Sequence, residues 1–265
     1  EVVAQILFSN NTTSTFVPTT TNILSINGPT LTNNIVIATG SELTLSNGLT
    51  LTYASTSNQR GDISGVLNLN TGSALNTTAA SFTIFTINAT GVINNFGTTF
   101  TTSPSTFVFS ASSNYNHNSS GGAVPTSTWN SASNTNINSA SSATLGGMTQ
   151  TFGNFILNTG GAVTTTLGSS VTNVVSNFVI QSGTLADNGY SVNVAGNFIN
   201  NGVHSGTGRI ILTGGPAAHN ISGTGTYRNL ELNDVLGSNL FNSIAIDGTL
   251  TLTNGSFSIG TNTLT

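Results

Sequence analysis

The chain has 265 residues, only 4% of them charged, and a formal net charge of −4. An ordinary soluble domain carries roughly 25% charged residues, so polarity here comes mainly from Asn, Thr and Ser. The cations are Arg60, Arg209 and Arg228, and their dispersal excludes the basic cluster that nucleic acids or anionic membranes require. No apolar run approaches the roughly 18 residues that span a bilayer, and there is no Cys for a disulfide or a thiol nucleophile.

Short apolar stretches, many of them alternating with polar residues, follow one another along the chain. In the first half they cover 23–26, 35–37, 43–46, 49–52, 66–69, 82–87, 92–93 and 107–109. In the second half they cover 155–157, 178–180, 192–194, 210–212, 230–232, 244–246 and 250–253. They are rich in β-branched and aromatic residues and bracketed by Gly, Asn, Asp or Ser, which is typical of strands. No stretch keeps a helical period for three turns, so we predict an all-β protein.

Composition divides the chain into three segments. Residues 1–109 and 151–265 alternate strands and turns, whereas 110–150 is rich in Ser, Asn and Gly. The middle segment is either a linker between two solenoids or a set of rungs with enlarged loops. We favour the rungs, because Thr128-Trp129-Asn130 has the pattern of a strand.

A short phrase recurs in the second half of the chain. It reads Gly153-Asn154-Phe155, then Ser176-Asn177-Phe178, then Gly196-Asn197-Phe198, and weakens to Arg228-Asn229-Leu230. Each copy is followed by an apolar stretch and a turn, so a unit of about 20–30 residues repeats, as in a solenoid.

The repeat favours one all-β architecture, a right-handed parallel β-helix, over a sandwich, whose strands rarely repeat in sequence. At about 22 residues per rung the chain would form roughly twelve rungs, spaced about 4.8 Å apart. We expect Phe155, Phe178 and Phe198 to share one inward stack, and corner Asn residues to hydrogen-bond along the axis.

Several phrases resemble a recurring series in very large secreted proteins of the Bacteroidetes. They are 115–118 (YNHN), 121–130 (GGAVPTSTWN), 150–155 (QTFGNF), 223–233 (GTGTYRNLELN) and 247–255 (DGTLTLTNG). The resemblance covers 105–265 well and earlier residues only in style. It implies a repetitive, adhesin-like β-helix protein of the cell surface, exported by the type IX secretion system. The start at Glu1, without a signal-like segment, indicates a mature or truncated chain.

Carboxylates are the first candidates for catalytic residues in this sequence. A glycosidase requires two converging carboxylates, and the candidate pairs are Glu231 with Asp234 and Asp187 with Asp247. Glu231 lies between Leu230 and Leu232, so we interpret it as an outward strand residue and Asp234 as a turn former. A calcium-dependent lyase is excluded by the absence of Lys and of an acidic cluster.

The histidines, His117, His204 and His219, are isolated, and no metal-binding spacing joins them. We interpret them as surface-loop residues. Gly206-Thr207-Gly208 and Gly223-Thr224-Gly225 are interpreted as turns, since no helix follows to bind phosphate. We therefore expect no enzymatic activity, no catalytic residue, no cofactor and no metal.

The first functional hypothesis is an extracellular structural and adhesive segment of a cell-surface stalk or filament. Its expected partners are surface glycans or a substratum, or copies of itself end to end or side by side, without nucleic-acid binding or membrane insertion. The alternatives are a carbohydrate-active enzyme and an ice-binding module, the latter because Thr50/Thr52 and Thr249/Thr251/Thr253 align hydroxyls on one strand face. The start at 2–8 is largely apolar, and 263–265 ends within the repeat. We therefore expect a longer native protein or end-to-end polymerisation.

Overall fold

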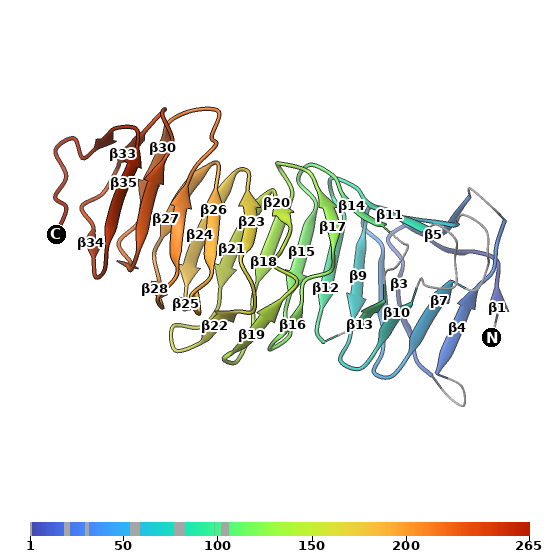
Figure 1. Ribbon diagram of the computed structural model, residues 1–265. Helices are drawn as coiled ribbons and strands as arrows, with labels where there is room; N and C mark the ends of the chain where they lie inside the picture. The colour runs from blue at the N-terminus through green and yellow to red at the C-terminus, as the bar shows by residue number, and fades with distance from the viewer. Residues whose placement is uncertain are drawn as a thin grey trace. The chain divides into compact units, whose positions relative to one another are not determined.

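The computed structural model describes residues 2–18, 22–29, 32–53, 59–76, 83–97, 99–101 and 106–265. In these residues the protein is all-β without a helix, and its parallel strands stack as a β-solenoid of about 11 turns (Figure 1). This confirms the predicted parallel β-helix. Of the predicted strand 82–87, residues 83–87 form a strand and Phe82 lies outside the described residues.

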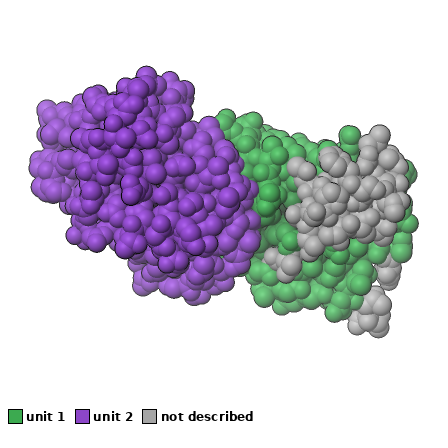
Figure 2. All heavy atoms as spheres, viewed as in Figure 1, with its two compact units in different colours: residues 1–119, 125–133 green, residues 120–124, 134–265 purple. Residues whose placement is uncertain are grey.

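The chain forms two compact units (Figure 2). Unit 1 comprises Glu1–Ser119 and Pro125–Ser133, and unit 2 comprises Ser120–Val124 and Asn134–Thr265. The Ser/Asn/Gly-rich segment 110–150 carries strands in both units, and the boundary between the units falls inside it.

Unit 1 has three parallel sheets, which we call A, B and C1. Sheet A consists of β1 (Val2–Val3), β4 (Ile23–Ile26), β7 (Thr50–Tyr53), β10 (Ala74–Asn76) and β13 (Thr99–Thr101). Sheet B consists of β2 (Ile6–Phe8), β5 (Asn33–Ile37), β8 (Gln59–Ile63), β11 (Thr83–Ile87), β14 (Thr106–Phe109) and β17 (Ser127–Trp129). Sheet C1 consists of β3 (Thr13–Phe16), β6 (Glu42–Leu45), β9 (Val66–Leu69), β12 (Val92–Asn95) and β15 (Asn114–His117).

Unit 2 also has three parallel sheets, which we call C2, D and E. Sheet C2 consists of β18 (Asn134–Ile137), β21 (Asn154–Asn158), β24 (Asn177–Ser182), β27 (Asn197–Asn200), β30 (His219–Ser222), β33 (Ser238–Leu240) and β36 (Phe257–Ser258). Sheet D consists of β16 (Gly122–Ala123), β19 (Ala143–Gly146), β22 (Thr164–Leu167), β25 (Thr184–Ala186), β28 (Val203–Ser205), β31 (Thr226–Tyr227) and β34 (Ala245–Ile246). Sheet E consists of β20 (Thr151–Phe152), β23 (Val171–Val174), β26 (Ser191–Val194), β29 (Arg209–Leu212), β32 (Leu230–Asn233) and β35 (Leu250–Asn254).

The recurring Asn-Phe phrase marks the start of a strand of sheet C2. Phe155, Phe178 and Phe198 pair in register on β21, β24 and β27. Their rings stack in the core, with centroids 5.8 Å and 5.4 Å apart, which confirms the predicted stack. The weakened fourth copy does not extend this stack: the residue opposite Phe198 is Ile221, and Leu230 lies on β32 of sheet E. An apolar strand residue alone does not tell which sheet of a rung it enters.

The Asn of the phrase points outward and forms a ladder. Asn154 donates to Asn134, Asn177 to Asn154 and Asn197 to Asn177, through side-chain amides at 3.1, 3.0 and 3.1 Å. We had predicted such Asn residues at corners, and that placement is wrong: the ladder lies on the outward face of the strands. Since each bond joins neighbouring rungs, the ladder holds the register of the stack.

A second ladder follows sheet C1 in unit 1. Asn68 donates to Thr44 at 3.1 Å, Asn94 to Asn68 at 2.8 Å and Asn116 to Asn94 at 2.7 Å. Inside the same unit, the Phe85 ring stacks on Phe107 with centroids 5.1 Å apart. Aromatic stacks inside and amide ladders outside therefore occur in both units.

Candidate functional site

The outward faces of unit 2 differ in chemistry. Sheet C2 carries the Asn ladder, and sheet D presents small uncharged residues such as Thr164, Thr184 and Thr226. Sheet E carries an ion pair between Arg209 of β29 and Glu231 of β32. Charge on the strand faces of unit 2, within the described residues, is thus concentrated on sheet E.

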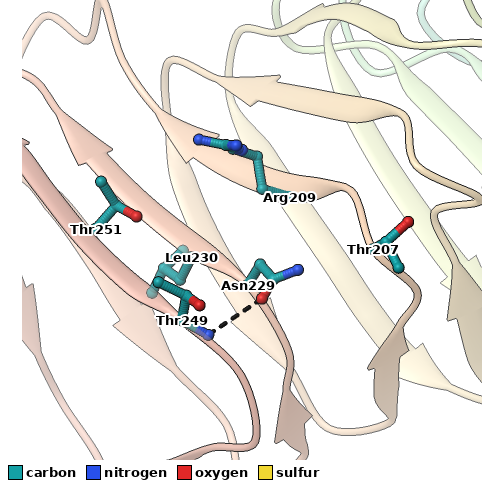
Figure 3. Close-up of a pocket in the computed structure, with 6 residues that line it drawn as sticks. All are labelled: Thr207, Arg209, Asn229, Leu230, Thr249 and Thr251. Carbon is teal, nitrogen blue, oxygen red and sulfur yellow. Dashed lines mark hydrogen bonds between the residues drawn. The ribbon is translucent and has the colours of Figure 1, made fainter.

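A groove of about 220 Å³ runs across sheet E near the starts of β29, β32 and β35 (Figure 3). It is lined by Thr207, Arg209, Asn229, Leu230, Thr249 and Thr251. Asn229 is fixed in place, because its Oδ1 accepts from the Thr249 N–H at 3.1 Å and its Nδ2 donates to the Gly208 carbonyl at 2.7 Å. The groove therefore presents hydroxyls and a guanidinium on a rigid sheet.

The ion pair beside the groove is geometrically well defined. The Arg209 Nη1 donates to Glu231 Oε2 at 2.8 Å, and the Thr253 hydroxyl donates to Glu231 Oε1 at 2.9 Å. The Arg209 hydrogen bond lowers the pKa of Glu231 below its ordinary value of 4.5 and outweighs the opposing effect of burial. Half of the Arg209 side chain remains exposed (50%), so the guanidinium can still reach a ligand.

The carboxylates of the two candidate pairs lie in different environments. Glu231 faces outward, as predicted, whereas Asp234 accepts bonds from the backbone N–H groups of Leu236 and Gly215. Asp187 is fully buried, but Asp247 is 80% exposed beside Arg228. The carboxylates of each candidate pair therefore have different hydrogen-bond or ion-pair partners.

The histidines are not in surface loops, and that prediction is wrong. His117, His204 and His219 are all buried. His204 Nε2 lies 2.9 Å from Asp187 Oδ2, and His219 Nε2 lies 3.1 Å from Asp234 Oδ2. The alternation of Asn114-Tyr115-Asn116-His117, which places Tyr115 and His117 on one face, was the available signal.

The two aspartates paired with histidine also act as turn anchors. Asp187 Oδ1 accepts from the N–H groups of Gly189 and Gly208, at 2.9 and 2.7 Å. Burial raises the pKa of Asp187, but these bonds and the one from His204 outweigh burial and hold it below 3.8. The second glycine of Gly206-Thr207-Gly208 thus belongs to a turn, as predicted, with its N–H directed at a carboxylate.

Within the described residues, no three His, Asp or Glu side chains are grouped so that they could hold a metal ion. The same residues include no helix of the length and hydrophobicity needed to cross a bilayer. Comparison with protein-family models, curated proteins and solved structures finds no match to the chain.

Proposed function

We propose that this chain is an extracellular structural and adhesive β-solenoid, a segment of a cell-surface stalk or filament that contacts surface glycans or a substratum. The observation that carries the proposal is the construction of both units from parallel rungs, locked by inward aromatic stacks and outward amide ladders. Such stacking makes each rung depend on its neighbours and suits a load-bearing element. The resemblance to exported Bacteroidetes surface proteins supports the same role.

The groove on sheet E is the proposed contact site for glycans. Its hydroxyls and the exposed guanidinium of Arg209 match the hydrogen-bonding groups of a sugar. The site lies on strands rather than on loops, which keeps its donors and acceptors in place.

Copies of the chain are a further proposed partner. Unit 2 exposes several large apolar side chains: Leu252 is 56% exposed, whereas its register partner Leu232 is fully buried. Phe241 and Ile259 are also exposed, at 61% and 40%. Exposed apolar side chains favour contacts between molecules, so sedimentation of the protein should show concentration-dependent association.

Retention of protein-coated beads on a polysaccharide-coated surface under flow tests adhesion. The expected result is retention that Thr251→Trp reduces, because the indole fills the groove, and that Thr184→Trp on sheet D leaves unchanged. Retention no greater than that of beads coated with an unrelated neutral protein would refute the proposal.

A second candidate, an ice-binding module, is favoured by one observation. On sheet D, Thr144 pairs with Thr166 and Thr164 pairs with Thr184, so hydroxyls repeat both along and across the strands. Thermal hysteresis that disappears in Thr166→Tyr would support ice binding, and its absence in the wild-type protein would exclude it.

A further inference from the structure

Among the corners between sheets E and C2, the longest loop follows β29. In two successive rungs the corner has two residues, 175–176 and 195–196, between the strands. In the next rung six residues, 213–218, separate β29 from β30, with the sequence Thr-Gly-Gly-Pro-Ala-Ala. The loop is therefore an insertion into the repeat rather than part of it.

A buried His–Asp pair holds this loop. Asp234 Oδ2 accepts from the Gly215 N–H at 2.7 Å and lies 3.1 Å from His219 Nε2. On the other side of its ring, His219 Nδ1 donates to the carbonyl of Gly196 at 2.6 Å. These bonds connect the loop and the residue that follows it to the corners of the next and the preceding rungs.

The loop forms one wall of a pocket of about 320 Å³. Val175, Ala195, Pro216 and Ala217 supply apolar surface, and Asn177 and Asn197 supply side-chain amides. None of the residues lining the pocket is charged or aromatic. The pocket therefore suits an uncharged ligand that combines a small apolar group with amide-like hydrogen bonding.

The two asparagines keep hydrogen-bonding capacity for such a ligand. In the ladder, Asn197 donates one N–H to Asn177 and accepts from the Asn220 N–H, at 3.1 and 3.0 Å. Asn177 in turn donates one N–H to Asn154 at 3.0 Å. A carboxamide has two N–H donors and two acceptor sites on its oxygen, so each can make further bonds without breaking the ladder.

We propose that this corner pocket binds an N-acetylhexosamine unit of a glycan. The acetyl methyl group packs against the side chains of Ala195, Ala217 and Pro216, while the acetamido N–H and C=O bond to the amides of Asn177 and Asn197. The absence of charge disfavours uronic acids, and the absence of an aromatic platform places selectivity in the acetamido group rather than in the sugar ring. The inference rests on the proposed adhesive function and names one glycan class for it.

Binding of tri-N-acetylchitotriose and of cellotriose to the intact chain, measured by titration calorimetry, tests the pocket. The two sugars share linkage and length and differ in the acetamido group. We expect chitotriose to bind at least about tenfold more tightly, a difference of about 1.4 kcal/mol. In saturation-transfer NMR the acetyl methyl should receive the strongest signal. Equal affinities, or no chitotriose binding at millimolar concentration, would overturn the inference without requiring any variant.

The matched variants are Ala217→Trp, which fills the pocket from an exposed loop position, and Thr226→Trp, an exposed position on sheet D. The first should weaken chitotriose binding by at least about tenfold, and the second should not change it. Unchanged binding in Ala217→Trp would place the sugar elsewhere. Bead retention on glycans without N-acetyl groups depends on the groove of sheet E, so it would persist even if the corner pocket bound no sugar. The proposed function and the corner-pocket inference can therefore fail separately.

Discussion

Replacing Phe178 by Ala tests the stacked core directly. The side chain is 1% exposed, and its ring lies 5.8 Å from that of Phe155 and 5.4 Å from that of Phe198. Truncation removes the ring and leaves a cavity between two rungs that cannot close without breaking the ladder of backbone bonds. A buried Phe→Ala change costs about 3–5 kcal/mol, and the parallel stack on both sides places this site within that range.

Urea unfolding followed by far-UV circular dichroism measures the change in the free energy of unfolding, provided that its dependence on urea concentration, the slope m, is the same in the variant and the wild type. The matched control is Val179→Ala, the next residue on the same strand, which faces outward and should cost about 1 kcal/mol or less. Hydrogen exchange should show the greatest loss of protection in β21, β24 and β27, because rungs depend mainly on their neighbours. If Phe178→Ala lowered the free energy of unfolding no more than Val179→Ala does, the parallel stack would be refuted.

Three further predictions concern backbone space, pH and the ion pair. Gly61→Ala should destabilise by about 1–3 kcal/mol, because a Cβ there would lie 2.4 Å from the Phe85 ring; Gly160→Ala, where the nearest atom is 3.6 Å away, is the control in thermal unfolding. The pKa of Asp187 in the folded protein is held below 3.8. The contribution of Asp187 to the free energy of unfolding should therefore be complete above pH 3.8 and be lost as the pH falls through the folded pKa. Asp187→Asn should flatten this acid limb of a stability–pH profile, and an unchanged profile would contradict the assignment. Arg209→Ala should change stability by about 1 kcal/mol or less, as for an exposed ion pair, yet reduce bead retention on glycans; equal retention would remove Arg209 from the contact site.

Sequence alone was sufficient for the repeat and for the inward stack. Alternation sets which residues face the core, and the recurrence of Asn-Phe placed Phe155, Phe178 and Phe198 together, as the register confirms. The last rung also follows its sequence pattern, since 245–246, 250–254 and 257–258 form β34, β35 and β36. Periodicity is a local property, so it can be read without knowing the neighbours.

What the sequence did not settle depends on neighbouring rungs. Leu230 has the same local pattern as the phenylalanines, but it lies on β32 and pairs with Ile210 of sheet E. His204 and His219 were interpreted as surface-loop residues because each is isolated in the sequence. Their carboxylate partners, Asp187 and Asp234, lie 17 and 15 residues away in the chain. Burial of a polar side chain requires a partner, and that partner became visible only in three dimensions.

We propose that this solenoid attaches to glycans, and we expect that it does not cleave them. The most direct measurement combines bead retention under flow with product analysis on the same neutral glycan and N-acetylglucosamine surfaces. The account predicts retention by the intact chain, a decrease with Thr251→Trp or Ala217→Trp on the matching surface, and no released oligosaccharide. Released oligosaccharide that disappears in Glu231→Gln, or beads that wash away from every glycan surface, would contradict it.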